Sequence, residues 1–289
     1  MAREAFRPQA PPVPIRRLRG GTWGAGDDQV AAEEPLQILL DSQPLSVVMR
    51  TPGNDVELAL GLLWSERALP SVDAVDHILV SAEAGEEAET EDQTRVRADL
   101  LESNTVDIVR RDPSAPTPAR RAFVTSSACG ICGTVTVDEL AAGWPTIPPG
   151  PRLSWDLLGG LPERLREAQR VYRRTGGEHG AALFDDSGEL LVAREDVGRH
   201  NAVDKIVGRL FLDRALPATG RVLAVSGRAG FEIVQKAVAA GVCVVVAVGA
   251  PSSLAVATAR RFDLTLIGFA APDRGNVYAG GYRILELGA

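Results

Sequence analysis

Apolar and polar positions along the first part of the chain predict a hairpin followed by a helix. Two short apolar runs, LQILL (36–40) and LSVVMR (45–50), flank the turn-forming letters DSQP, a pattern typical of two antiparallel strands. Behind them apolar residues recur at helical spacing, and Asn54 with Glu57 forms a capping-box pattern. We therefore expect a helix over about 54–68.

Three further strands complete a small mixed domain. VDHILV (75–80), TRVRADL (94–100) and TVDIV (105–109) have the composition of strands, and the insert AEAGEEAETEDQ between the first two carries six acidic residues, as solvated loops do. This order of strands and helix predicts an α+β roll over 27–145. The roll contains the Cys-x-x-Cys loop SSACGICG (126–133) near its end.

The second half alternates strands and helices, which predicts an α/β domain over 146–289. Its strands are continuously apolar, so we expect both faces of the sheet to be covered. Gly241 stands where a helix C-terminal glycine belongs. The expected elements are a helix over 162–174, a hairpin over 181–196, a helix over 199–214, a strand over 221–227, a helix over 229–241, a strand over 242–248, a helix over 252–262 and a strand over 264–269.

The first 26 residues lack such periodicity. They are rich in Pro, Arg and Gly, which predicts a flexible leader over 1–26. No apolar run of signal-peptide or membrane-span length is visible, so we expect a cytoplasmic protein without a membrane partner. The net charge of −7 argues against a nucleic-acid partner, although clustered arginines can still hold an anionic ligand.

Two of the three cysteines lie three positions apart in a glycine-rich loop. In a reducing cytoplasm, Cys129 and Cys132 favour catalysis, redox exchange or metal binding over a structural disulfide. A zinc site needs two further ligands, and Cys243 lies in an apolar strand where a buried small side chain is expected. Zinc deaminases place a His-x-Glu motif before Pro-Cys-x-x-Cys, whereas here the thiols precede GGEHG (176–180). We therefore expect no metal.

Redox exchange and sulfur transfer remain, beside the alternative that both thiols are incidental turn residues. A thioredoxin-type dithiol opens a helix, which lowers the thiol pKa, but CGICG leads into the strand-like TVTVDEL (134–140). A flexible loop suits a sulfur carrier, in which one thiolate holds a sulfane sulfur as a persulfide. The second thiol can then assist its release through disulfide exchange.

Polar and glycine-rich stretches of the α/β half are candidates for an anion site. His179 precedes a strand and alone is more typical of a turn whose imidazole bonds to backbone. EDVGRHNAVDK (195–205) gathers polar residues, His200 among them, and helix capping explains only some of these. SGRAG, with Ser226 and Arg228, and GAPSS each lie between a strand and a helix, where backbone amides favour phosphate. We expect an anionic, nucleotide-like ligand.

Five motifs, in the same order, resemble the FdhD family of formate dehydrogenase accessory sulfurtransferases: ACGICG, TGGEHGAALF, REDVGRHNAVDK, SGRAGFEIVQKA and LTLIGFAAPDRGNVYAG. The resemblance extends over about 30–289. It implies a small ubiquitin-like roll followed by a cytidine-deaminase-like three-layer α/β domain without the deaminase zinc, and a homodimer.

The resemblance also implies a reaction. A cysteine desulfurase would load sulfur onto the loop, with Cys129 as the persulfide carrier and Cys132 as the assisting thiol. The protein would pass the sulfur to a bound substrate, the molybdenum bis(molybdopterin guanine dinucleotide) cofactor, which then enters formate dehydrogenase. A non-catalytic cofactor chaperone and a zinc-dependent hydrolase are the alternatives. The implied cofactor segment is Phe269, Ala270, Ala271, Pro272, Asp273 and Arg274, and Ser226, Arg228, His179 and His200 are further candidates for cofactor binding.

Overall fold

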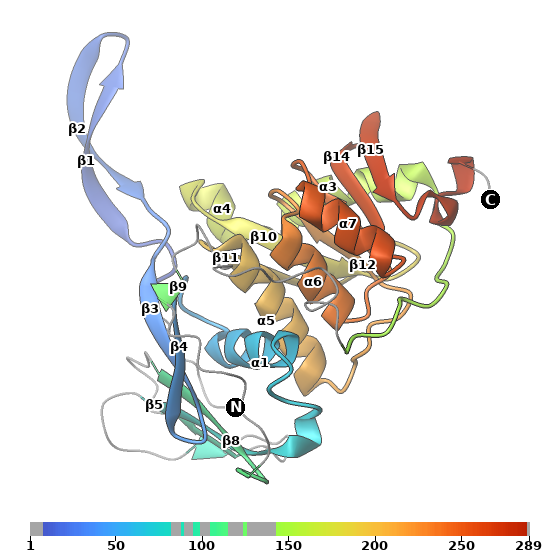
Figure 1. The fold of residues 1–289 in the computed structure, drawn as a ribbon. Coiled ribbons are helices and arrows are strands. Elements are labelled where there is room, and N and C mark those ends of the chain that lie inside the picture. Colours follow the sequence, from blue (N-terminus) through green and yellow to red (C-terminus); the bar gives the residue numbers. More distant parts are fainter. Residues whose placement is uncertain are drawn as a thin grey trace.

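The computed structural model describes residues 8–81, 88–89, 95–98, 105–114, 124–125 and 143–287, and Figure 1 shows their arrangement. A projecting hairpin, a mixed sheet packed on a helix, and a second mixed sheet flanked by helices follow one another along the chain. The loop with Cys129 and Cys132 lies outside the described residues, as does most of the acidic insert.

Residues 12–29 form an antiparallel hairpin, an element that the prediction of a flexible leader over 1–26 did not include. Its strands are β1 (Pro12–Arg19) and β2 (Thr22–Gln29), which pair in register and turn at two glycines with positive φ. Prolines in β1 and glycines in β2 interrupt the alternation that marks a strand, and this hid the hairpin from the pattern.

The N-terminal sheet has seven strands within the described residues, in the order β6-β7-β5-β8-β3-β4-β9. The predicted hairpin is confirmed, and Asp41 and Ser42 at its turn both have positive φ, as in a type I′ turn. The strands are β3 (Glu34–Leu40), β4 (Gln43–Arg50), β5 (Val75–Ser81), β6 (Ala88–Glu89), β7 (Arg95–Ala98), β8 (Thr105–Arg110) and β9 (Val124–Thr125), with a 3-10 turn η1 (Val72–Ala74) before β5.

The predicted helix is confirmed as α1 (Asp55–Ser65), but the capping box is not formed. Asn54 has a left-handed backbone, with φ of 57°, and its side chain makes no capping hydrogen bond. Glu57 instead accepts hydrogen bonds from Arg194 in the other half of the protein. The acid in the first turn of α1 therefore serves a contact between the halves.

The C-terminal sheet has the order β11-β10-β12-β13-β14-β15 within the described residues. Strands β12, β13 and β14 are parallel, and the outer pairings are antiparallel. Figure 1 shows α5, α6 and α7 on one face and α3 on the other. The bounds are α3 (Trp155–Ala168), α4 (Arg170–Thr175), β10 (His179–Phe184), β11 (Leu190–Asp196), α5 (Arg199–Leu212), β12 (Val222–Val225), α6 (Phe231–Ala239), β13 (Val244–Ala247), α7 (Ser253–Arg261), β14 (Thr265–Ala271) and β15 (Arg274–Ala279), followed by 3-10 turns η2 (Gly281–Arg283) and η3 (Leu285–Leu287).

Two details of this half differ from the prediction. The helix expected over 162–174 begins at Trp155, where the Ser154 hydroxyl accepts from the Leu157 amide at 3.3 Å, and it breaks at Gln169. A proline usually marks a first helical turn, but Pro162 lies inside α3. Strand β15, which the pattern did not predict, follows β14 in a hairpin.

Each half has its own apolar core, and the helices α1 and α5 pack between them. The helix backbones approach so closely that a Cβ on Gly61 would overlap the Asp204 carbonyl, and one on Gly208 would overlap the Glu57 carbonyl. The two halves are therefore joined by tight helix packing, whereas Ile147, in the Pro-rich stretch expected to link them, packs in the core of the C-terminal half. None of the described helices has the length and apolar content needed to span a bilayer.

Candidate functional site

The turns after the parallel strands meet at one edge of the C-terminal sheet. The Gly249 amide after β13 donates to the Gly227 carbonyl after β12 at 2.9 Å, and the Phe269 amide donates to the Gly249 carbonyl at 3.3 Å. The Ser252 amide donates to the Ala229 carbonyl at 3.2 Å. The two predicted glycine-rich turns, SGRAG (226–230) and GAPSS (249–253), are thus neighbours at the carboxyl edge of the parallel strands, where open α/β sheets bind ligands. They are named the strand-end turns.

Gly249 allows this close approach because it has no side chain. A Cβ there would lie 3.0 Å from the backbone N and Cα of Arg228. Since the Gly249 amide is already bound by the protein, the first turns of α6 and α7 are where helix geometry leaves backbone amides that an anion could bind. The Arg228 side chain is exposed beside them.

His179 lies against the same edge. Its Nδ1 would be 3.2 Å from a Cβ on Gly227, and its ring is half-buried. Burial is the largest effect that lowers the pKa of His179, and the nearby Arg199 and His200 lower it further. The imidazole is therefore neutral at pH 7, with one ring nitrogen able to donate and the other to accept a hydrogen bond.

His200 and Ser226 belong to this edge but are held by other protein groups. His200 Nε2 lies 2.7 Å from Glu232 Oε2, which joins the first turns of α5 and α6, and this bond lowers the pKa of Glu232. Ser226 Oγ accepts from the Gly180 amide at 2.8 Å. Both residues therefore fix the turns in place.

The predicted cofactor segment forms the end of β14 and the start of β15. Phe269 has a left-handed backbone, with φ of 55°, and its side chain is 46% exposed. The Trp155 indole donates to the Pro272 carbonyl at 3.1 Å and anchors the hairpin to α3. Phe269 therefore joins this segment to the strand-end turns, whereas Arg274 lies across the hairpin turn, in register with Ala271. Ala270 is buried and Ala271 half-buried, whereas Pro272, Asp273 and Arg274 are exposed.

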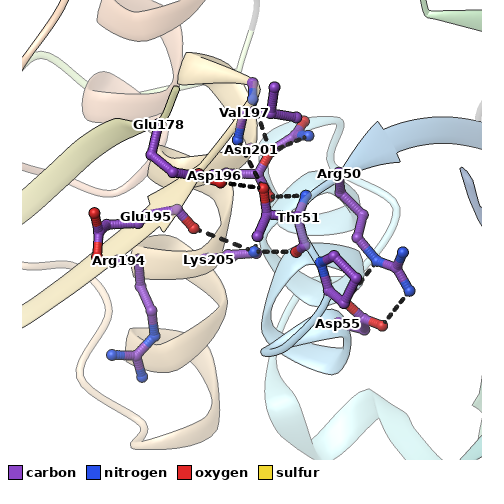
Figure 2. Close-up of polar contacts among 12 residues, drawn as sticks. Arg50, Thr51, Asp55, Glu178, Arg194, Glu195, Asp196, Val197, Asn201 and Lys205 are labelled. Carbon is purple, nitrogen blue, oxygen red and sulfur yellow. Dashed lines mark hydrogen bonds and ion pairs between the residues drawn. The ribbon is translucent and has the colours of Figure 1, made fainter. Parts of the chain in front are cut away.

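A buried polar network joins the two halves, and the sequence did not reveal it (Figure 2). Thr51, just after β4, donates its hydroxyl to Glu178 Oε1 at 2.6 Å and accepts from the Val197 amide at 3.1 Å. Its own amide donates to Asp196 Oδ2 at 3.2 Å, and Lys205 Nζ donates to its carbonyl at 2.9 Å. The C-terminal half therefore uses every polar group of Thr51.

Lys205 supplies the buried cation of this network. Its Nζ lies 2.8 Å from Asp196 Oδ2, and both side chains are almost fully buried. The Asn201 amide group donates to Asp196 Oδ1 at 2.9 Å and to the Met49 carbonyl at 2.8 Å. The polar residues of the motif around α5 thus bind the end of β4, which neither helix capping nor a solvated face explains.

Glu178 connects the network to the strand-end turns, since it immediately precedes His179. Burial raises the pKa of Glu178 to about 7, although the Thr51 hydroxyl and Lys205 act in the opposite direction. Its second oxygen, Oε2, has no hydrogen-bond partner among the described residues. The protein therefore holds a carboxyl group that titrates near neutral pH at the boundary of its two halves.

Bidentate ion pairs flank this network. Arg194 binds Glu57 at 2.6 and 2.7 Å across the boundary, and the fully buried Arg50 binds Asp55 at 2.9 and 2.8 Å. The motif around α5 was the sequence signal for this region. Asp196 and Lys205 of that motif bind Thr51, which lies 145 and 154 positions away in the chain, where no motif marked it.

The predicted catalytic residues, Cys129 and Cys132, lie outside the described residues. The described strand β9 ends at Thr125, four positions before Cys129, and runs parallel to β4 with Val48 opposite Thr125. Because β4 ends at Arg50, next to Thr51, and β9 runs parallel to it, β9 points in the direction of the buried network.

The third cysteine has the core role predicted for it. Cys243 is buried, its thiol donates to the Arg221 carbonyl at 3.2 Å, and burial raises its pKa. In the part of the chain that the structure describes, no three His, Cys, Asp or Glu side chains gather as a metal-ligand set.

Known proteins resemble the chain over nearly its whole length. The model of the FdhD/NarQ family matches residues 31–285. Curated proteins called sulfur carrier protein FdhD from Streptomyces avermitilis and Sulfurisphaera tokodaii are 47% and 38% identical to it, over 93% and 94% of this chain and 94% and 98% of their own. A solved structure from Desulfotalea psychrophila, assigned as a formate dehydrogenase accessory protein, has a TM-score of 0.70 at 23% identity, over 96% of this chain and 100% of that one.

The two joined sheets are thus the fold of a protein assigned as an accessory factor of formate dehydrogenase. With the family match and the close relatives, the resemblance found in the sequence is confirmed. The chain belongs to the FdhD/NarQ family.

Proposed function

We propose that this protein is a sulfurtransferase required for formate dehydrogenase activity. It accepts persulfide sulfur from a cysteine desulfurase and transfers it to the molybdenum bis(molybdopterin guanine dinucleotide) cofactor before the cofactor enters formate dehydrogenase. The observation that carries this proposal is the 47% identity, over 93% of the chain, to a protein called a sulfur carrier. The dithiol in its glycine-rich loop supplies the chemistry that such a role requires.

The chemistry has two steps. The Cys129 thiolate attacks the outer sulfur of the desulfurase persulfide, a new S–S bond forms, and the desulfurase thiolate leaves. Cys132 then attacks Cys129 Sγ, so that the sulfane sulfur leaves as sulfide toward the molybdenum while the two cysteines become a disulfide. A thiol reductant restores the dithiol for the next cycle.

The strand-end turns are the proposed place for the guanine dinucleotide part of the cofactor. A pyrophosphate needs cationic forks and helix N-termini, and Arg228 with the first turns of α6 and α7 offers both. The exposed ring of Phe269 offers an apolar surface, and the neutral His179 offers a donor and an acceptor. The buried network then lies between these turns and the strand that leads to Cys129.

We also propose the following fold, oligomeric state and location for this protein. They are a ubiquitin-like roll for the N-terminal sheet with α1, a cytidine-deaminase-like three-layer C-terminal half, a homodimer, and a cytoplasmic location beside the desulfurase and formate dehydrogenase.

Persulfide trapping tests the proposal. The protein is incubated with a cysteine desulfurase and cysteine, alkylated and analysed by peptide mass spectrometry, and one added sulfur is expected on Cys129. Cys129→Ser should lose this label and the activation of formate dehydrogenase, whereas Cys243→Ser, which changes a buried core thiol, is the matched control and should keep the label. Cofactor binding without any sulfur label would instead identify a non-catalytic chaperone.

A further inference from the structure

The hairpin of β1 and β2 extends away from the rest of the fold (Figure 1). At its base, Arg174 of α4 donates to the Gln29 side chain at 3.0 Å, and the Val30 amide donates to the Pro11 carbonyl at 3.1 Å. Beyond that base the strands pair with each other over eight residues each. A two-stranded hairpin is only marginally stable by itself in water, so a packing partner for this arm would stabilise it.

Near its turn, one face of the arm is apolar and basic, and the same face also carries the exposed Asp27, opposite Pro14 and nearer the base. Leu18 and Trp23 lie opposite each other in register beside the turn and are 52% and 63% exposed. Arg16, which is exposed, lies two positions from Leu18 and therefore on the same face, and Arg19 is exposed at the turn. An exposed Trp beside Arg is typical of the centre of a protein–protein interface, and the exposed Leu18 extends its apolar surface.

A complementary surface lies on the same chain, at the β11 edge of the C-terminal sheet. Within the described residues β11 is the outermost strand on that side. Leu190 and Leu191 at its start are 42% and 46% exposed, and Asp186 and Glu189 in the preceding turn are exposed as well.

The turn before β11 is ordered and acidic. Asp185 Oδ1 accepts hydrogen bonds from the Ser187 and Glu189 amides, which holds the turn closed. Arg164 of α3 also reaches this turn and donates to the Gly188 carbonyl at 2.6 Å. Three carboxylates therefore gather at an apolar edge strand, beside Arg164 of α3 and within electrostatic reach of Arg221, whose charge acts on Asp185. An uncovered edge strand is a feature that proteins usually protect.

We propose that the arm of one copy docks on the β11 edge of a second copy. Leu18 and Trp23 would pack on Leu190 and Leu191, while the arginines of the arm face Asp186 and Glu189. Because both surfaces belong to one chain, two copies can exchange arms around a two-fold axis and close into a dimer. The arm exchange supplies an interface for the proposed homodimer, and it does not depend on the sulfur transfer that we propose.

Charge reversal with mixing tests this inference in the full chain. The arm variant is Arg16→Glu with Arg19→Glu, and the edge variant is Asp186→Arg with Glu189→Arg. Each alone places like charges at both contacts, so its dimer dissociation constant, measured by sedimentation velocity, should rise at least 10-fold. In an equimolar mixture each arm meets an edge of opposite charge, and the heterodimer should regain the wild-type stability.

The controls keep the outcome clear. Arg260→Glu with Arg261→Glu makes the same charge change on α7, near the opposite sheet edge, and should leave the dimer unchanged. Leu18→Ala with Trp23→Ala should weaken it without any charge change, and circular dichroism has to show that all variants are folded. A monomeric wild type, variants that dimerise like the wild type, or a mixture of folded variants that stays monomeric would each overturn the proposal. Persulfide loading is measured in a separate assay, so a failure of the proposed sulfur transfer would not change the result for the dimer.

Discussion

The Thr51 hydroxyl and the Glu178 carboxylate meet at 2.6 Å across the boundary between the two halves of the protein. Thr51 follows β4, the strand that pairs with β9 just before the cysteine loop, and Glu178 precedes His179 at the strand-end turns. This hydrogen bond therefore links the two regions that the proposed sulfur transfer has to bring together. Since one partner titrates near neutral pH, the link also depends on pH.

Glu178 should make the protein less stable as the pH rises. Its pKa is raised from 4.5 to about 7, so between these values the folded state keeps a proton that the unfolded state releases. The stabilisation is complete below pH 4.5 and is lost as the pH rises through 7, and the whole difference corresponds to about 3 kcal/mol. Urea unfolding at pH 5 and pH 8 measures the change in the free energy of unfolding.

Glu178→Gln isolates this contribution from those of other groups with shifted pKa values, such as Asp204, whose burial raises its pKa to about 6, and His179, whose burial lowers its pKa. The amide oxygen still accepts from Thr51 but carries no titrating proton. The variant should lose less stability between pH 5 and pH 8 than the wild type does, and Glu163→Gln, an exposed position of α3, should behave like the wild type. An equal pH dependence in Glu178→Gln would refute the assignment.

The close approach of α1 and α5 should make Gly208 intolerant of any side chain. A Cβ there would overlap the Glu57 carbonyl of α1, which is a backbone group and not the end of a flexible side chain. We expect Gly208→Ala to reduce the free energy of unfolding by about 3 kcal/mol, the upper range for an overpacked core. Gly160→Ala in α3 is the control, because a Cβ at Gly160 meets nothing within 4 Å and alanine favours a helix. Thermal unfolding that ranks the two variants in the opposite order would contradict this account.

Removing the buried cation should be costly. Lys205→Met keeps the length of the side chain but leaves Asp196 buried without its cation, and we expect a loss of about 3–5 kcal/mol. Arg214→Gln breaks an ion pair with Asp73 in which both side chains are exposed, and it should be close to neutral. Chemical denaturation of both variants at pH 7 provides the measurement. A Lys205→Met protein as stable as Arg214→Gln would show that the network contributes little.

The sequence predicted those elements whose determinants are local. The hairpin of β3 and β4, the helix α1, and the strand and helix order of the C-terminal half all follow from apolar periodicity and turn residues within short windows. The arm was missed because Pro12, Pro14, Gly24 and Gly26 conceal its alternation.

The sequence predicted only those residues of the candidate site that lie within sequence motifs. The glycine-rich turns, His179 and Phe269 do meet at one sheet edge, since the carboxyl ends of parallel strands converge there. Thr51 could not be found, because its partners come from the other half and no local pattern marks a threonine that fold topology places in a buried network. The charge-rich motif around α5 indicated a functional region, but it could not show that its residues bind Thr51.

Arg274 should contribute to holding the guanine nucleotide end of the proposed cofactor. Its guanidinium is exposed across the hairpin turn from β14, and the same segment reaches the strand-end turns through Phe269. GDP, which carries one of the cofactor's nucleotide and pyrophosphate units, is a suitable probe. Loss of one charged hydrogen bond corresponds to about 1–3 kcal/mol, so Arg274→Ala should weaken GDP binding roughly 5- to 150-fold in a calorimetric titration. Arg260→Ala, in the last turn of α7 where the side chain donates to the Tyr278 carbonyl, is the control and should keep the wild-type affinity. Unchanged affinity in Arg274→Ala, with persulfide loading intact, would remove Arg274 from the site and leave Arg228 as the cation to test next, because it stands directly at the turn between β12 and α6.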